Sequence, residues 1–489
     1  MPDPDGPSRA VLRRTWAVAF VAFFLLGAGW AAGLPVNGTY DEKQHIVRAY
    51  AVADGHLTPT ARVTEETFLS PEGFHVPGSL LPGDPHCVWY PEDQAASCQG
   101  PAGPSGKVAR ASGAARYSPV YYLPVGLPML AWPDETGVVL GRLVSALLAA
   151  LMLASAVVAA LRLGSRLLVA GIALVTTPMV ANLNGSINPN GIEIAAGVLL
   201  FATLLALLRS DRDSRRLVLL ASVAALVLLT VRLFGPVLFA AIVAACLLVA
   251  RPGRIRSLAG RADVRWLFGG AVALGLLFAI GWNLLAAAAE LPAVTDRGRD
   301  LTYAQMAREI LTQRVPFHVR QVIGSFGYGK TGLSPVAVLI WYALLAVVTL
   351  PGVVGDRLVR RAAIGLTVFS VGLLVVLDAW FVRSIGWISH ARYVLPAAVG
   401  VVLIAAVADR LSLARLRPAL DRPALLVAVT VPLHVYAVAM VISRYRSGPD
   451  AVVNPFRGDW TPLWGPVVPL VAVLLGALGL ALLTWRPGR

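Results

Sequence analysis

Charged residues are scarce in this 489-residue chain: they make up 14 % of it, whereas a soluble domain carries about 25 %. This scarcity argues against a water-soluble enzyme. Hydrophobic residues make up 57 % of the sequence, and the mean hydropathy is +0.70. They fall into runs whose lengths are close to the ~20 residues that cross a bilayer core. The sequence therefore predicts an all-α polytopic membrane protein.

Lysine is almost absent: Lys43, Lys107 and Lys330 stand against 39 arginines, a usage typical of GC-rich bacterial genomes such as those of actinobacteria. The formal net charge of +15 would suggest nucleic-acid binding in a soluble chain. Here the excess positive charge lies in short segments between hydrophobic runs, on one side of the predicted topology. We therefore expect the lipid bilayer as a partner, and no nucleic acid.

We predict one integral membrane domain, 1–489, with about twelve transmembrane helices. The spans cover approximately residues 16–33, 137–161, 167–184, 190–208, 216–231, 234–250, 266–288, 335–354, 361–381, 393–409, 423–442 and 464–485. The positive-inside rule then places both termini in the cytoplasm. The first run is long for a signal peptide, so we interpret it as a retained helix.

Two long segments are predicted to lie outside the cytoplasm: loop 1, residues 34–136, with interfacial helices, and loop 2, residues 289–334. Loop 1 contains Cys87 and Cys98. Two cysteines in one extracytoplasmic loop favour a disulfide, with two free thiols as the alternative. No CxxC spacing supports a zinc site, and no Gly-rich phosphate loop or GxSxG motif is present.

The carboxylates Asp41 and Glu42 open loop 1, just beyond the first span, and precede an apolar pattern typical of an interfacial amphipathic helix. One interpretation is that Asp41 only caps this helix. The other is a general base at the lipid–water boundary, where an acceptor from water meets a donor from the bilayer. His45, one helical turn later, either orients Asp41, binds the acceptor, or is structural.

Basic residues near the outer ends of spans are candidates for binding an anionic substrate. Arg232 separates two short spans, and His390, Arg392 and Tyr393 open another. The alternatives without a role in binding are a charge at a helix end and an aromatic-and-basic belt at the membrane surface. Arg142, inside the span 137–161, either has a buried partner or snorkels to the headgroups.

Three further polar positions carry predictions. Lys330, in the Gly-rich stretch GSFGYGKTGLSP, belongs either to a mobile lid or to a plain loop. Glu193, which follows SINPNG, is expected to face a cavity and to contact substrate or a divalent ion. Asp378 is expected to form a structural pair with Arg383.

The order of these motifs resembles the GT-C superfamily of polytopic glycosyltransferases, which use polyprenyl-phosphate sugars. A first helix is followed by a loop with an Asp–Glu pair and a histidine, a Pro–aromatic stretch, and a Gly-Arg-Leu-x-Ser-Ala-Leu helix. More narrowly, the chain is similar to the bacterial membrane family of unknown function twenty-one forty-two. The matching motifs are DEKQHIVRAY at 41–50, YSPVYYLP at 117–124, SINPNG at 186–191 and HARYVLP at 390–396.

The chain also departs from these families. It has His390-Ala391-Arg392-Tyr393 where the narrower family tends to have Gly-Arg-Tyr. It has no C-terminal soluble domain like that of arabinosyl- and oligosaccharyltransferases, which leaves recognition of the acceptor unexplained.

The resemblance implies an inverting glycosyltransferase that moves a sugar from a polyprenyl-phosphate donor to an envelope glycan or lipid acceptor. The reaction would take place on the outer face of the bacterial cytoplasmic membrane, with Asp41 or Glu42 as the general base. The implied substrate-binding residues are His45, Arg142, Glu193, Arg232, Lys330, His390, Arg392 and Tyr393. No cofactor is required, although a divalent cation, Mg or Mn, is compatible with the superfamily.

Two rival functions remain open at this point. One is a transporter or flippase for a lipid-linked or envelope precursor, which would predict inverted repeats and ionisable groups near the bilayer midplane. The other is a non-catalytic envelope-assembly subunit, in which Asp41 would be dispensable.

Overall fold

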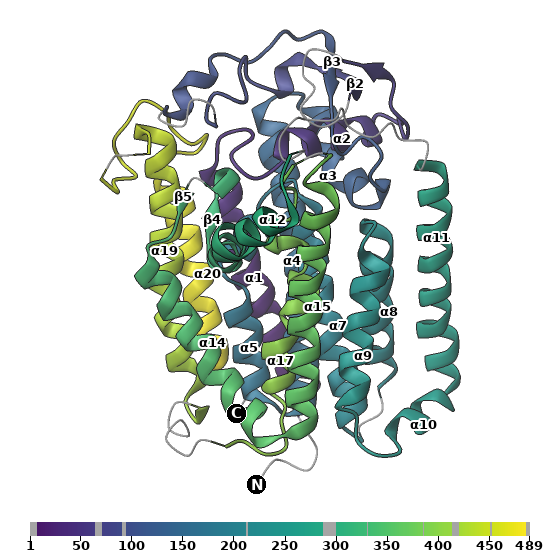
Figure 1. Cartoon of the computed structure of the whole chain (residues 1–489). Coiled ribbons are helices and arrows are strands. Elements are labelled where there is room, and N and C mark those ends of the chain that lie inside the picture. Colours follow the sequence, from purple (N-terminus) through teal and green to yellow (C-terminus); the bar gives the residue numbers. More distant parts are fainter. Residues whose placement is uncertain are drawn as a thin grey trace.

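A computed structural model describes residues 7–63, 71–89, 94–211, 214–286, 300–329, 331–384, 386–412, 420–449 and 452–485. Most of the helices run side by side as an elongated bundle, and one end of the bundle is covered by irregular segments and short strands (Figure 1). The bundle helices are α1 (Arg9–Gly33), α4 (Glu135–Leu163), α5 (Arg166–Val175), α6 (Pro178–Asn184), α7 (Pro189–Arg209), α8 (Arg215–Val231), α9 (Gly235–Leu248), α10 (Arg254–Ala259), α11 (Gly270–Ala286), α14 (Pro335–Gly355), α15 (Arg357–Phe381), α16 (Leu395–Ala398), α17 (Gly400–Ala405), α19 (Pro423–Ser447) and α20 (Val467–Trp485).

The structure confirms an all-α polytopic membrane protein, and the number of about twelve spans stays a prediction. In the described part of the chain, eight helices are long and apolar enough to cross a bilayer. A ninth span results if α5 and α6, which are bent by 72° at their junction, are counted together. The other predicted ranges hold shorter helices, which are α8, α9 and α16–α17.

Helix α7 lies at the centre of the bundle, since every residue of its apolar window is buried. It packs against α4 and α8, while α1 packs between α4 and α20. Small residues allow the closest approaches. A Cβ atom at Gly197 of α7 would clash with the carbonyl oxygen of Pro396, so glycine is required for α16 to lie this near to α7. This contact positions the segment that carries Arg392.

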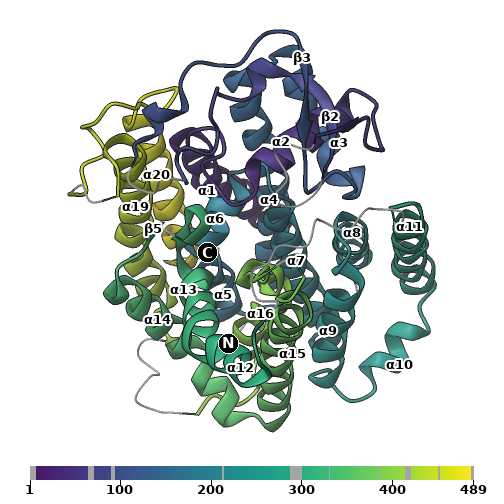
Figure 2. The ribbon, with the colours of Figure 1, turned by 45° about the horizontal axis from the view of Figure 1, so that its top comes forward.

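Loop 1 folds into a cap over one end of the bundle (Figures 1 and 2). It contains α2 (Glu42–Ala53), a three-stranded antiparallel sheet and α3 (Pro119–Ala131), together with the short 3-10 helices η1 (Gly78–Leu80) and η2 (Ala96–Gln99). The strands β1 (Ala61–Arg62), β2 (Glu72–Pro77) and β3 (Lys107–Ala111) pair in the order β1-β2-β3, with His75 opposite Ala109. Helix α3 packs along α2, so the sheet and both helices form one layer.

A disulfide joins Cys87 and Cys98, whose Cα atoms are 6.0 Å apart. Helix α19 holds the same part of the cap in place, because Arg444 donates hydrogen bonds to the carbonyl oxygens of Val88 at 3.0 Å and Gln94 at 2.7 Å. The cap is therefore fastened to the last helices of the chain as well as to the first.

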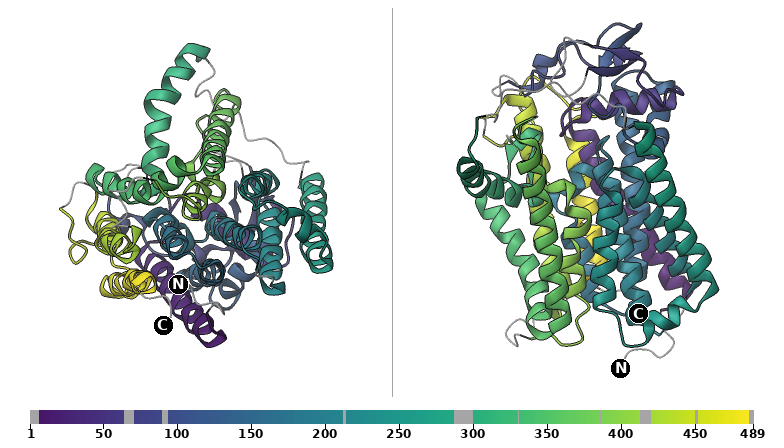
Figure 3. Two further views of the ribbon diagram at one scale, coloured as in Figure 1. Left: turned by 90° about the horizontal axis from the view of Figure 1, so that it is seen from below. Right: turned by 45° about the vertical axis from the view of Figure 1, so that its right-hand side comes forward.

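Loop 2 lies at the same end of the bundle (Figure 1). From residue 300 onward it forms α12 (Tyr303–Glu309), a π-helical turn (Ile310–Arg314), α13 (Val315–Ile323) and a short hairpin of β4 (Ser325–Phe326) and β5 (Thr331–Gly332). Helices α1 and α20 begin and end, respectively, at the opposite end of the bundle, which is also the end where α10 lies (Figures 1 and 3). The cap and loop 2 thus enclose one end of the bundle, and the arginine-rich connection at α10 lies at the other.

Candidate functional site

The two adjacent carboxylates at the start of α2 have different surroundings. Asp41 has left-handed backbone torsions, with φ at 58°, and precedes the first turn of α2. Its side chain is 26 % exposed, whereas that of Glu42 is completely buried. Asp41 makes no side-chain cap hydrogen bond to the helix. The pair therefore divides into one accessible and one inaccessible carboxylate.

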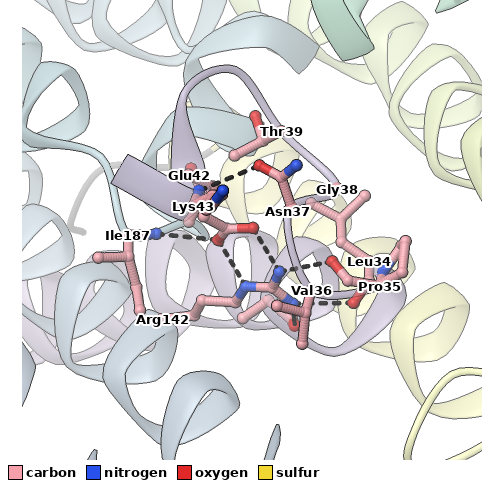
Figure 4. Close-up of polar contacts among 12 residues, drawn as sticks. Leu34, Pro35, Val36, Asn37, Gly38, Thr39, Glu42, Lys43, Arg142 and Ile187 are labelled. Atoms are coloured by element: carbon pink, nitrogen blue, oxygen red, sulfur yellow. Dashed lines mark hydrogen bonds and ion pairs between the residues drawn. The ribbon is translucent and has the colours of Figure 1, made fainter. Parts of the chain in front are cut away.

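Glu42 forms a buried ion pair with Arg142 of α4 (Figure 4). The Arg142 Nε and Nη2 atoms donate to the two carboxylate oxygens at 2.7 and 2.5 Å. The remaining N–H groups of Arg142 donate to the carbonyl oxygens of Ala31, Leu34 and Pro35. All five donors of this guanidinium are used within the protein, so Arg142 does not snorkel to the surface.

Arg392 brings the C-terminal half of the chain to Asp41. Its Nη2 atom donates to the Asp41 carboxylate at 2.5 Å. The guanidinium lies over the rings of Tyr40, at 4.5 Å, and Tyr393, at 5.1 Å. Arg392 is 1 % exposed, and within the described residues its Nε and Nη1 atoms have no hydrogen-bond partner. Two buried donors of a permanently charged group are thus left unused beside Asp41.

Arg232, at the C-terminal end of α8, reaches the same ring. Its guanidinium carbon is 4.8 Å from the Tyr393 ring centroid. The guanidinium carbon of Arg392 is 5.1 Å from the same centroid, so both arginines contact one ring. Nη1 of Arg232 donates to Asn190 Oδ1 at 2.5 Å and pairs with Glu193 Oε2 at 3.3 Å. Among the described residues, Glu193 Oε1 is buried without a partner.

His45 lies near enough to both cations to feel their charges. Its Nδ1 atom is 2.8 Å from the hydroxyl of Tyr122, and its ring lies 6.0 Å from that of Tyr117. Burial, followed by the charges of Arg232 and Arg392, holds the pKa of His45 well below its usual value. His45 is therefore a neutral imidazole at physiological pH, suited to hydrogen bonding and not to balancing a negative charge.

His390 contacts the cluster from the segment between α15 and α16. Its Nδ1 atom is 3.0 Å from the Gln321 amide nitrogen, and its ring meets the edges of Tyr40 and Tyr393. Burial and the charges of Arg392 and Arg314 keep the pKa of His390 well below its usual value. Burial also raises the pKa of Tyr40 to about 12, so that its phenol is protonated.

A comparison with family models matches residues 24–401 to the family described as "Predicted membrane protein (DUF2142)". The chain belongs to this family. No curated protein sequence matches the chain significantly. Two solved structures of ArnT from Cupriavidus metallidurans are similar to it, one bound to undecaprenyl phosphate and one in the apo state.

The ArnT likeness is distant. The structure with undecaprenyl phosphate has 16 % identity and a TM-score of 0.43, covering 96 % of this chain and 76 % of ArnT. The apo structure has 14 % identity and a TM-score of 0.46, covering 96 % and 75 %. At TM-scores below 0.5, these matches carry no argument for function.

In this DUF2142 chain, the structure gathers most of the sequence-derived candidates into one connected cluster. Asp41, Arg392, Tyr393, Arg232 and Glu193 follow one another through direct contacts. Glu42 and Arg142 form a separate buried pair behind Asp41. Lys330 lies outside the described residues.

Sequence reasoning missed several members of the cluster, which are Tyr40, Tyr117, Tyr122, Asn190 and Gln321. Three of them belong to motifs that the sequence analysis singled out, since Tyr117 and Tyr122 lie in YSPVYYLP and Asn190 lies in SINPNG. Gln321 has no such signal. It joins the cluster only because α13 folds back over the segment that carries His390.

The predicted pair of Asp378 with Arg383 is wrong. Asp378 instead pairs with Arg314 of loop 2, at 3.1 Å, and accepts a hydrogen bond from the backbone N–H of Ser389. Arg383 donates to the carbonyl oxygen of Leu301 and stacks over Tyr303. The chain turns at the end of α15, and this turn directs the two side chains to different neighbours.

The cluster is well suited to an anionic group beside an acceptor. Two buried guanidinium groups flank one tyrosine ring, and one of them keeps two donors unused. Guanidinium groups bind phosphate oxygens through paired, charge-assisted hydrogen bonds. No group of three or more His, Cys, Asp and Glu side chains able to hold a metal ion occurs within the described ranges.

Proposed function

We propose that this protein is an inverting glycosyltransferase that moves a sugar from a polyprenyl-phosphate donor to an envelope glycan or lipid acceptor. The observation that carries the proposal is the contact between accessible Asp41 and buried Arg392, whose Nε and Nη1 atoms have no described partner. A carboxylate and a cation with unused donors are the two groups that such a transfer requires. The resemblance of the sequence motifs to the GT-C superfamily supports the same reaction.

In the proposed step, an acceptor hydroxyl oxygen attacks the anomeric carbon of the donor sugar from the face opposite the phosphate. Asp41 accepts the hydroxyl proton as the new carbon–oxygen bond forms. The bond between the anomeric carbon and the phosphate oxygen breaks, and polyprenyl phosphate leaves with that electron pair. Arg392 and Arg232 stabilise the charge that develops on the phosphate.

Glu42 has a different role in this proposal. Its two oxygens are occupied by Arg142, and one of them also accepts from the backbone N–H of Ile187 at 3.2 Å. A carboxylate without exposed surface has no access to an acceptor hydroxyl. Glu42 therefore fixes the start of α2, and Asp41 is the base.

The orientation of the bundle supports an extracytoplasmic site in the cytoplasmic membrane of a bacterium. Helix α10, with Arg254 and Arg256, lies at the end of the bundle opposite α2 (Figure 1). Arginine-rich connections are retained in the cytoplasm. On this basis both termini are cytoplasmic, and the cap of loop 1 and the Asp41 cluster face outward.

The experiment that tests this proposal is a transfer assay with the purified full-length protein in lipid nanodiscs. Polyprenyl-phosphate sugars extracted from the native membranes serve as donors, and envelope material from a deletion strain serves as acceptor. We expect acceptor-dependent release of polyprenyl phosphate that Asp41→Asn abolishes. Release of polyprenyl phosphate at equal rates by wild type and Asp41→Asn would contradict the proposal. Movement of intact donor across the bilayer would favour the transporter or flippase alternative.

A further inference from the structure

A cavity of about 440 Å³ opens on loop 2, outside the Asp41 cluster. The π-helical turn and α13 supply Thr312, Gln313, Phe317 and Arg320 to its wall, and Trp387 closes it from the segment that leads to Arg392. Its size lies within the ~300–1,000 Å³ that small-molecule sites usually occupy. None of these residues was singled out from the sequence.

Two aromatic rings of the cavity wall are held in place by one cation. The Arg314 guanidinium lies 5.0 Å from the ring centroid of Phe317 and 5.7 Å from that of Trp387. Arg314 is itself fixed by Asp378, at 3.1 Å, and by the carbonyl oxygen of Ser389, at 2.5 Å. The rings are thus positioned before any ligand arrives, which lowers the entropic cost of binding.

The polar groups of the cavity include both hydrogen-bond donors and acceptors. The side chains of Glu309, Gln313 and Arg320 line it, and within the described residues no hydrogen bond or ion pair engages them. Glu309 disfavours an anion, and Arg320 disfavours a cation. A neutral, hydroxyl-rich ligand satisfies both, because each hydroxyl group donates and accepts. Flat aromatic rings beside such groups suit the C–H faces of a sugar.

Successive ring contacts connect the cavity wall to the proposed reactive cluster. Phe317, in the cavity wall, lies 5.8 Å from His390. The His390 ring in turn lies 5.0 Å from Tyr40 and 5.6 Å from Tyr393, which both stack on Arg392. The cavity therefore lies beside the aromatic residues that surround Arg392 and Asp41.

We propose that this cavity binds the acceptor, and that the acceptor is a neutral saccharide chain. The cavity would bind the sugar units that adjoin its reacting end. The inference rests on the proposed transferase function for the role of the ligand. It addresses how the acceptor is recognised.

The test measures saccharide binding and donor binding separately, on the full-length protein in nanodiscs. The saccharide probe is the mixture of soluble oligosaccharides released by mild acid from the envelope of the native strain, observed by saturation-transfer NMR. The donor probe is polyprenyl phosphate. The variants are Trp387→Leu and Gln313→Ala, and Trp266→Leu is the matched control, because Trp266 is 80 % exposed and precedes α11 at the opposite end.

We expect wild type and Trp266→Leu to bind oligosaccharide, and both cavity variants to bind it about tenfold more weakly or worse. Polyprenyl phosphate should bind equally to all four proteins. Absence of oligosaccharide binding by wild type, or unchanged affinity in both cavity variants, overturns the inference. Retained polyprenyl-phosphate binding in that case shows that only the acceptor site is wrong. Because Gln313 is exposed, its variant remains informative even if Trp387→Leu perturbs Arg314.

Discussion

Arg392 donates a hydrogen bond to Asp41 at 2.5 Å, although the two residues are 351 positions apart in the chain. The arginine is almost completely buried, and the aspartate is partly exposed. In the proposed function, a donor phosphate that reaches Arg392 competes with Asp41 for the same guanidinium. Binding of the donor and release of the carboxylate are then coupled, because one cation serves both.

The first prediction concerns Arg392 as a phosphate ligand. Arg392→Gln should weaken the binding of polyprenyl phosphate by roughly ten- to a hundredfold, since charge-assisted hydrogen bonds contribute about 1.5–3 kcal/mol. The measurement is the equilibrium binding of radiolabelled polyprenyl phosphate to nanodiscs. Arg360→Gln, an exposed arginine on α15, is the control and should bind like wild type. Equal affinity in Arg392→Gln would remove this residue from the site.

The second prediction follows from the competition between phosphate and Asp41. Asp41→Asn removes the negative charge that occupies Arg392 but leaves the buried pair of Glu42 and Arg142 intact. We expect this variant to bind polyprenyl phosphate at least as tightly as wild type, in the same binding assay. Weaker binding by a normally folded variant would show that Asp41 helps to hold the donor. That result would contradict the competition between Asp41 and the donor phosphate for Arg392.

The third prediction separates structural from chemical carboxylates. Glu42→Gln and Arg142→Met should each destabilise the protein by about 3–5 kcal/mol, because a buried partner loses its counter-charge. The double variant Glu42→Leu/Arg142→Met should be less destabilised than the sum of the two single effects. Thermal unfolding of the purified protein measures all three. A wild-type melting temperature for Glu42→Gln would show that the pair does not fix the start of α2.

The fourth prediction concerns pH. The pKa of His45 lies well below its usual value in the folded protein, whereas in the unfolded chain it is about 6.5. Below that pH the unfolded chain binds a proton that the folded protein excludes, so stability should fall as pH decreases. His390 contributes with the same sign.

His45→Gln should therefore lose less stability than wild type when melting is measured between pH 7.5 and 5.5. If His45→Gln and wild type have the same slope, the histidine is not excluded from protonation in the folded state.

The sequence predicted the helical class and the location of helices well. A long apolar run in a bilayer must satisfy its own backbone hydrogen bonds, and a helix does so within one segment. The count of about twelve spans stays a prediction, since α8, α9 and the α5–α6 pair are too short or too bent to be judged by length alone. It also identified Asp41, Arg232 and Arg392 as candidates.

The sequence did not predict which partners these residues choose. The contacts of Tyr393 with both arginines depend on how α8 and the segment before α16 are placed around α7, which no local pattern records. The division of labour between Asp41 and Glu42 likewise depends on where Arg142 of α4 projects. The error over Asp378 has the same origin, because proximity in sequence did not predict the direction of the side chains.

The most direct test of the central claim is mass spectrometry of the envelope glycan and the lipid-linked sugars in a deletion strain. The strain is complemented with wild type or with Asp41→Asn at equal abundance. We expect one sugar to be missing from the glycan, its polyprenyl-phosphate donor to accumulate, and only wild type to restore both. Complete restoration by Asp41→Asn would contradict the proposed transferase, since the carboxylate would then have no part in the chemistry.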